Sequence, residues 1–181
     1  WMAENLKVTK YRNGDNITNI TTNSAWSTNT SGAYGVYDND ETTYLKSYGR
    51  LYNWYAVDNS SSRYICPEGW HVPTTNEYDA LSTYLGGTSV AGGKMKETGT
   101  DHWNSTNTGA TNSSGFTARG SGLRVYNTGS YIYVKNTNYI WTANQANSTT
   151  ARYRYIYYNS STFSSSTTFK RYGFSVRCLE D

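Results

Sequence analysis

The 181-residue sequence has little net charge and no long apolar run. No segment approaches the ~20 consecutive apolar residues that span a bilayer, and no signal-peptide pattern is present. The 16 lysines and arginines and 13 acidic residues are spread along the chain, giving a formal net charge of +3 without a basic block. This distribution offers no electrostatic surface for nucleic acid. We therefore expect no nucleic-acid partner and no membrane insertion by this segment.

Histidine and cysteine are also scarce, with two of each. No Cys-x-x-Cys spacing accompanies His71 and His102, so we expect no zinc site and no other cofactor. Cys66 and Cys178 are an even pair far apart in the sequence. We favour a disulfide between them, which would close a long loop and add ~4–5 kcal/mol in the chain-entropy model. Two buried free thiols, the usual state in a reducing cytosol, are the alternative.

The residue types used in catalysis show no recognisable arrangement. Neither histidine lies in a Gly-x-Ser-x-Gly setting, and both are interpreted as structural. The spacing of Asp38, Asp40, Glu41 and Asp101 does not place them in one cleft. The first three could offer oxygen ligands to calcium, but a solvated turn is the simpler interpretation. We expect no catalytic residue and no metal site.

What the sequence has in quantity is aromatic side chains, with 19 tyrosines and 6 tryptophans. Each buried aromatic removes about 150–250 Å² from water, so these residues can form a core although Leu, Ile and Val are sparse. Disordered chains combine few aromatics with high net charge, and this chain has neither property. We expect one folded domain over residues 1–181.

One helix and a series of strands are expected. Thr74 and Glu77 form a capping-box pattern before an apolar face, which predicts a helix over residues 75–85. Loops after this helix are expected to be anchored in the core by Met95, Trp103 and Phe116. Short alternating or aromatic-rich runs predict strands at 51–57, 121–127, 131–136, 138–143, 152–159 and 172–179. These elements predict the α+β class with a mostly antiparallel sheet.

Residues 142–172 form a tract built mostly of Ser, Thr, Tyr and Asn. Tyr gives large amphipathic contact area at low entropy cost, and Ser and Asn give adaptable hydrogen bonds, as in antibody-type binding surfaces. A polar low-complexity tail is the alternative. The alternating run ARYRYIYY and the apolar anchors Ile156 and Phe163 argue against it. The tract is interpreted as a binding surface.

A strand through this tract would separate its side chains onto two faces. Tyr153, Tyr155 and Tyr157 would share one face, and Arg154 and Ile156 would share the other. We expect Tyr155 and Tyr157 to be displayed together, with core packing of single tyrosines as the alternative.

Five sequence blocks resemble a known family. They are WMAENL at 1–6, LYNWYAV at 51–57, CPEGWHVPT at 66–74, AGGKMKETGT at 91–100 and GFSVRC at 173–178. In this order, over almost the whole chain, they resemble the Fibrobacter succinogenes major paralogous domain. The resemblance implies a C-type lectin-like fold in the branch related to formylglycine-generating enzymes. It also implies a ligand-binding variable protein of a diversity-generating retroelement, because some members have that role.

In such retroelements template adenines are copied with errors, so AAY codons for Asn scatter to Tyr, Ser, Thr, Ala, Phe, Arg and others. Within 142–172 only Gln145 and Lys170 could not arise in this way. The resemblance implies a scaffold of Ala151, Tyr153, Arg154, Ile156, Phe163 and Lys170. It implies variable, ligand-contacting positions at Asn144, Ala146, Asn147, Tyr155, Tyr157, Ser160, Thr162, Ser164, Ser166, Thr167, Thr168, Phe169, Arg171 and Tyr172. Arg152, where the family often has Trp, is a further ligand-binding candidate.

The expected function is binding of a protein or glycan ligand on another cell or particle, outside the cell, at a cell surface or on a virion. Because Trp1 lies within an expected strand, we expect an N-terminal targeting region to be missing. Formylglycine-generating relatives need a second cysteine near Cys178, and its absence predicts that the chain is no enzyme. The alternative is a non-diversified, cell-surface lectin-like domain that binds carbohydrate or protein. Glu-Pro-Asn and Trp-Asn-Asp sugar-binding motifs are absent, but aromatic rings can stack on sugars without metal.

Overall fold

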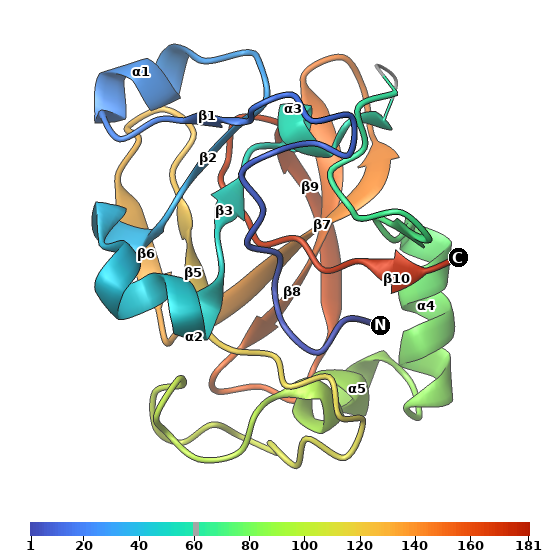
Figure 1. The fold of residues 1–181 in the computed structure, drawn as a ribbon. Helices are drawn as coiled ribbons and strands as arrows, with labels where there is room; N and C mark the ends of the chain where they lie inside the picture. Colours follow the sequence, from blue (N-terminus) through green and yellow to red (C-terminus); the bar gives the residue numbers. More distant parts are fainter. Residues whose placement is uncertain (60–61) are drawn as a thin grey trace.

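The structure, a computed structural model, describes residues 1–59 and 62–181. Its largest element in that part of the chain is a five-stranded main sheet with the order β6-β5-β7-β8-β9 (Figure 1). Its strands are β5 (Ser121–Arg124), β6 (Tyr131–Val134), β7 (Thr137–Gln145), β8 (Thr150–Tyr157) and β9 (Ser164–Phe169). β5 and β7 run parallel, and the other neighbours are antiparallel.

Smaller sheets and short helices surround the main sheet. One small sheet has the order β1-β2-β3, and another pairs β4 with β10. Their strands are β1 (Thr18–Asn19), β2 (Ala33–Gly35), β3 (Leu51–Tyr52), β4 (Trp70–His71) and β10 (Leu179–Glu180). The helical segments are α1 (Asn23–Thr28), η1 (Tyr37–Asn39), η2 (Glu41–Leu45), α2 (Lys46–Tyr48), α3 (Trp54–Val57), α4 (Thr75–Tyr84) and α5 (Thr88–Met95). The expected α+β class with antiparallel-rich sheets is confirmed.

Helix α4 begins and ends close to where its sequence signals predict. The Thr74 side chain accepts the Glu77 N–H, and the Glu77 carboxylate accepts the Thr74 N–H at 2.7 Å, which completes the capping box. Tyr78 and Leu85 are buried. The helix ends at Tyr84, one residue before the predicted end, and Gly86 follows with a φ of 97°.

The expected strand over residues 51–57 is wrong beyond its first two residues. β3 stops at Tyr52, and α3 follows immediately. The Asn53 side-chain oxygen accepts the N–H groups of Ala56 and Ala33, at 3.2 and 3.0 Å. This cap begins a helix where the aromatic-rich composition favours a strand, because one buried amide serves both the helix and the neighbouring β2.

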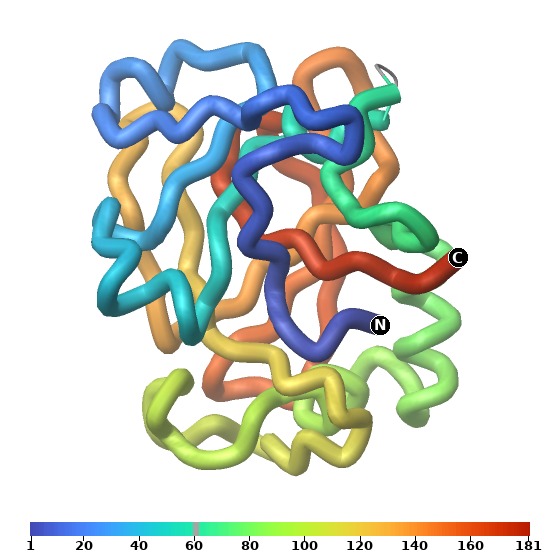
Figure 2. The backbone as a smooth tube through the Cα atoms, viewed as in Figure 1, coloured from blue at the N-terminus to red at the C-terminus, as the bar shows by residue number. Residues whose placement is uncertain are grey.

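Residues 173–175 are extended, but they do not lie in one strand as expected. Gly173 pairs with Arg124, Phe174 with Tyr52, and Ser175 with Ile140. The segment therefore runs between β5, β3 and β7 and joins two sheets. It continues beside the N-terminal residues, where Val176 accepts the Leu6 N–H at 2.8 Å (Figure 2). Trp1, expected within a strand, lies outside any strand.

Strand β9 was not expected. Its sequence, SSSTTF, has no apolar alternation to mark it. It forms because it pairs with β8 along its whole length, from Phe169 opposite Thr150 to Ser164 opposite Tyr155. The polar middle of the tract is therefore an ordered edge strand.

Two aromatic-rich cores lie within the domain. The first contains Tyr52, Trp141 and Phe174, and the second contains Tyr78, Ile156 and Phe163, among others. Met95, Trp103 and Phe116 are all buried in the second core, as predicted, but Met95 is the last residue of helix α5, where a loop was expected. The first core also contains the disulfide that joins Cys66 to Cys178, with 6.0 Å between their Cα atoms.

Buried tyrosines predict a loss of stability in alkali. Burial raises the pKa of Tyr52 and Tyr78 well above 10, and that of Tyr48 and Tyr131 to about 12. Above pH 10 the unfolded chain ionises its tyrosines while the folded chain keeps them neutral. The contribution of these tyrosines to the free energy of unfolding is therefore complete below pH 10 and is lost as the pH rises from 10 towards 12. Urea denaturation at pH 8, 10 and 11 measures this loss.

Tyr78→Phe is the matched control, because the buried Tyr78 hydroxyl has no hydrogen-bond partner. We expect this variant to be no less stable at pH 8 and to lose less stability by pH 11. A midpoint that stays constant from pH 8 to 11 would contradict the prediction.

Candidate recognition surface

β8 has two faces of different character. On one face Arg154 and Ile156 are buried, whereas on the other Ala151 is buried, Tyr155 is half-buried and Tyr157 is 41% exposed. Tyr155 and Tyr157 share one face with Tyr153, as the alternation predicts. Ladder partners continue that face across the sheet, where Tyr139 lies opposite Tyr155 on β7 and Ser164 lies opposite it on β9. The result is a face of aromatic rings and hydroxyl groups.

The rings on this face form a ladder of contacts. Tyr139 stacks on the buried Phe174 at a centroid distance of 5.0 Å and contacts the rings of Tyr153 and Tyr155 at 5.8 and 5.9 Å. Tyr155 contacts Tyr157 at 5.2 Å. Exposure rises from 7% at Tyr139 to 41% at Tyr157. The ladder holds an exposed ring in place through buried ones, so little side-chain entropy remains to be lost on binding.

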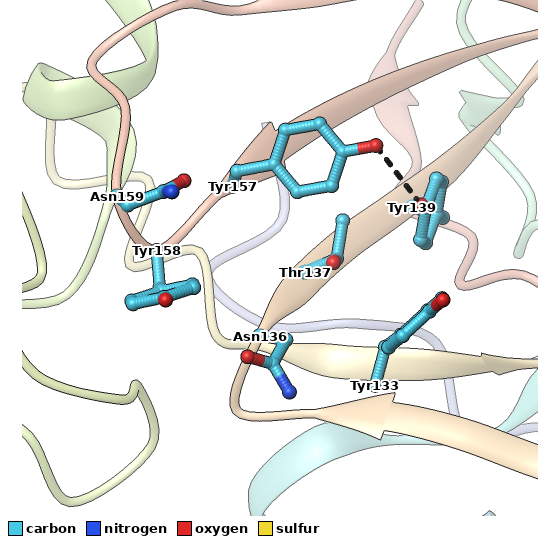
Figure 3. Close-up of a pocket in the computed structure, with 7 residues that line it drawn as sticks. All are labelled: Tyr133, Asn136, Thr137, Tyr139, Tyr157, Tyr158 and Asn159. Atoms are coloured by element: carbon cyan, nitrogen blue, oxygen red, sulfur yellow. Dashed lines mark hydrogen bonds between the residues drawn. The ribbon is translucent and has the colours of Figure 1, made fainter.

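A hollow of about 420 Å³ opens at the exposed end of the ladder. In Figure 3 the Tyr157 ring lies over it, with its hydroxyl pointing to that of Tyr139, 3.5 Å away. No charged side chain lines the hollow, whose walls are formed by Tyr133, Asn136, Thr137, Tyr139, Tyr157, Tyr158 and Asn159. Such a combination of apolar rings with a few amide and hydroxyl groups suits an uncharged ligand with several hydroxyl groups.

The end of β6 and the turn after it hold one wall of the hollow in an uncommon conformation. Tyr133 has a φ of 67° and Lys135 a φ of 62°. Bulky side chains rarely adopt this left-handed region, which costs of order 1–3 kcal/mol and is found most often at functional sites. The Tyr133 ring is 53% exposed. The backbone thus maintains an exposed aromatic ring at the edge of the hollow.

Lys96 holds the chain that leaves β8. Its ammonium group donates to the carbonyl oxygens of Thr108, Tyr157, Tyr158 and Ser160, at 2.9, 3.3, 3.1 and 3.0 Å. Three of these carbonyls belong to the turn that carries Tyr157 and Tyr158. The side chain is fully buried, and burial lowers the pKa of its ammonium group to about 8.

Two glycines of α5 let the loop after β8 pack closely. A Cβ atom on Gly92 would lie 2.6 Å from the Thr162 carbonyl oxygen, so no other residue fits there without a shift. The Gly93 N–H donates to the Ser161 carbonyl at 3.0 Å. Phe163 then enters the second core. This packing gives the two glycines of α5 a structural role beside the tract at 142–172.

The predicted ligand-binding positions fall in four places rather than on one surface. The tyrosine face carries Tyr155, Tyr157, Ser164, Ser166 and Thr168, and Ser160 and Thr162 follow it in the next loop. Arg152 and Thr167 pair with each other and, by the alternation, point to the opposite face. The third group surrounds Tyr126, where Phe169 stacks at 4.5 Å and Tyr172 and Arg171 lie at 5.0 and 5.7 Å.

The fourth place is the end of β7 and the turn that leads to β8. Ala146 and Asn147 are exposed, and the Asn147 side chain accepts the N–H groups of Thr149 and Thr150 within the turn. Asn144 accepts the Thr75 N–H at 2.7 Å and so fixes β7 to the start of α4. The structure therefore assigns Asn144 a packing contact.

Five of the six residues expected to form a scaffold are buried. Ala151, Ile156 and Phe163 are fully buried. Arg154 pairs with Asp79 and donates to the Thr75 carbonyl, and the Lys170 ammonium lies 4.5 Å from the Trp54 ring centroid. The sixth, Tyr153, is half-buried within the ladder.

Several residues of the hollow were missed from the sequence. Tyr133, Asn136, Thr137 and Tyr139 precede the tract, and only the pairing of β6 and β7 with the rest of the sheet brings them to Tyr157. The sequence offers one signal for them, the spacing of aromatic and amide residues in YIYVKNTNY at 131–139. That spacing predicts two strands and a turn, but it does not by itself predict a binding site.

The acidic cluster and the two histidines have local partners. Asp40 accepts the Thr43 N–H, and Glu41 pairs with Arg50. His71 contacts Glu77 and Asp181. Residues 1–59 and 62–181 hold no group of three or more His, Cys, Asp or Glu side chains that could bind a metal ion. In the same residues, no helix is long and apolar enough to cross a membrane.

The four hydrogen bonds from the Lys96 ammonium group to carbonyl oxygens, called the Lys96 cage below, yield a stability prediction. Lys96→Met keeps the length of the side chain but removes its hydrogen bonds to four carbonyl oxygens. Those of Tyr157, Tyr158 and Thr108 keep a second donor, whereas that of Ser160 loses its bond, at a cost of about 1–3 kcal/mol. We expect a clear fall in the free energy of unfolding, measured by urea denaturation. Lys94→Met, two residues earlier in the last turn of α5 and partly exposed, is the control and should change little. Equal stabilities of the two variants would show that the cage does not hold the turn.

Comparison with known proteins gives one match. The chain matches the Fibrobacter succinogenes major domain over residues 1–180. No curated protein and no solved structure matches it. Because the match covers nearly every residue, including the buried loop anchors and the whole tyrosine tract, the chain belongs to the Fibrobacter succinogenes major domain family.

Proposed function

We propose that this domain is a receptor-type binding protein whose ligand occupies the tyrosine-lined hollow and the adjoining face of β8 and β9. The observation that carries the proposal is the ladder from the buried Phe174 to the exposed Tyr157, which ends in an uncharged hollow. Exposed tyrosines held rigid in this way are typical of recognition surfaces. Affinity would come from burying the Tyr133 and Tyr157 rings, and specificity from the surrounding hydroxyl and amide groups.

We further propose that the fold is C-type lectin-like, in the formylglycine-generating-enzyme branch, and that the tract is diversified by a retroelement. The separation of positions within β8 supports this. Substitutions at Tyr155 and Tyr157 would change the surface without changing the second core. Ile156 and Phe163, in contrast, lie inside that core. A tract with this division can vary its exposed side chains while the fold persists.

The second candidate function is carbohydrate binding by a fixed, lectin-like domain. The uncharged lining of the hollow favours it, because rings and amides match the faces and hydroxyl groups of a neutral sugar. Either function fits an oxidising compartment, since the Cys66–Cys178 disulfide would be reduced in most cytosols. We propose an extracellular, cell-surface or virion-surface location.

The test is to compare three single-tyrosine variants for ligand binding. A glycan array and flow cytometry on a panel of bacterial cells would first identify a binding target for the wild-type domain. Tyr157→Ala and Tyr133→Ala should each weaken that binding by about 10-fold or more, as expected for aromatic residues central to an interface. All three variants should unfold at nearly the same temperature as the wild type.

Tyr84→Ala is the matched control. Tyr84 is 87% exposed on α4 and lies outside the hollow, so its removal deletes at least as much exposed aromatic surface elsewhere. Binding by Tyr84→Ala should equal that of the wild type. Two results would contradict the proposed site. One is that Tyr157→Ala and Tyr133→Ala bind the target as tightly as the wild type. The other is that Tyr84→Ala loses as much affinity as they do.

A further inference from the structure

A serine, a histidine and a glutamate form a hydrogen-bonded chain away from the tyrosine hollow. The His102 Nε2 atom lies 3.1 Å from the Ser47 hydroxyl oxygen, and its Nδ1 atom lies 2.6 Å from a Glu97 carboxylate oxygen. The carboxylate fixes the proton on Nδ1, which leaves Nε2 to accept the serine proton. This is the order of groups that activates a serine nucleophile in hydrolases.

The three side chains are held in place by separate parts of the chain. Ser47 lies in α2, and Glu97 follows α5, where the Arg119 guanidinium binds the other Glu97 carboxylate oxygen at 2.8–2.9 Å. His102 precedes Trp103, which is fully buried and donates to the Ala118 carbonyl. The Glu97 carboxylate and the imidazole therefore have little freedom to rotate away from each other.

A small hollow adjoins the serine. It has a volume of about 170 Å³, and its walls are formed by Ala3, Glu4, Asn5, Ser47, Thr117, Arg119 and Arg177. Ser47 and His102 are partly exposed, so a small molecule can reach them. Arg119 donates to the Ser47 carbonyl oxygen at 3.1 Å and so lies directly beside the nucleophile. A guanidinium at this place can stabilise negative charge that develops on a substrate oxygen.

We propose that Ser47, His102 and Glu97 form a hydrolytic site for esters with a short acyl group. The Ser47 oxygen attacks the ester carbonyl carbon, and its proton passes to His102 Nε2. The bond to the alcohol oxygen then breaks, and His102 returns the proton to that oxygen. Water repeats the sequence on the acyl-serine and releases the carboxylic acid and free Ser47. The size of the hollow limits the acyl group to a few carbon atoms.

The first experiment labels the wild-type domain with a fluorophosphonate probe and locates the label by mass spectrometry. We expect the label on Ser47. The second follows hydrolysis of p-nitrophenyl acetate and p-nitrophenyl octanoate, and the acetate should be preferred. Ser47→Ala and His102→Gln should lower the acetate rate by at least about 100-fold, the usual contribution of a positioned base. Circular dichroism and thermal melting would verify that both variants fold.

Glu97 is a positioning residue, and its test is the separation of kcat from KM. Glu97→Gln should lower kcat and leave KM nearly unchanged, because Glu97 contacts the His102 Nδ1 atom and does not line the hollow that would hold the ester. His71→Gln is the control, since both His71 nitrogens contact carboxylates rather than a hydroxyl group, and its rate should equal that of the wild type.

Two results would overturn the proposal. One is a folded wild-type domain that neither takes the label at Ser47 nor hydrolyses the acetate faster than His102→Gln. The other is hydrolysis that persists in Ser47→Ala. The label is read on the wild type alone, so this test is independent of whether the tyrosine hollow binds a ligand.

Discussion

The stacking of Phe174 on Tyr139 is the contact on which the rest of the arrangement depends. The two rings lie 5.0 Å apart and nearly parallel, and Trp141 and Tyr153 contact Phe174 at 4.4 and 5.0 Å. Phe174 lies four residues before the disulfide-bonded Cys178, and its backbone also forms the bridge to Tyr52. One buried ring thus joins the cross-linked core to the sheet that displays the tyrosines. In a chain with few aliphatic residues, aromatic contacts do the packing that Leu and Val do elsewhere.

Within the single strand β8, this arrangement separates buried side chains from displayed ones. On β8 Arg154 and Ile156 lie on the face towards α4 and are buried, and Arg154 pairs with Asp79, while the tyrosines on the ladder face become more exposed towards Tyr157. Apart from Phe169, the neighbouring β9 has small polar side chains, so its pairing with β8 depends on the backbone and tolerates changes of side chain. The Lys96 cage and the glycines of α5 hold the connecting loop through its backbone as well. Side chains of the tract can therefore differ without loss of the contacts that position them.

The sequence predicts those parts whose signals are local. The capping box and glycine stop of α4, the burial of single aromatic anchors and the alternation of β8 all depend on near neighbours, and the structure has all three. The strand over 51–57 was wrong because the Asn53 amide, bonded to β2, competes with local propensity. β9 was missed because its order comes from a partner strand. The hollow and the Ser47–His102–Glu97 chain combine residues tens of positions apart, which no short motif encodes.

The most direct test of the central claim is to sequence the DNA around the gene. The account predicts a near-identical repeat of codons 142–172 beside a reverse transcriptase, with mismatches confined to adenines. Mismatches should fall on codons of displayed residues, such as Tyr155 and Tyr157, and spare those of Ile156 and Phe163. Absence of the repeat, or mismatches spread equally over displayed and buried positions, would contradict a variable surface on a constant frame.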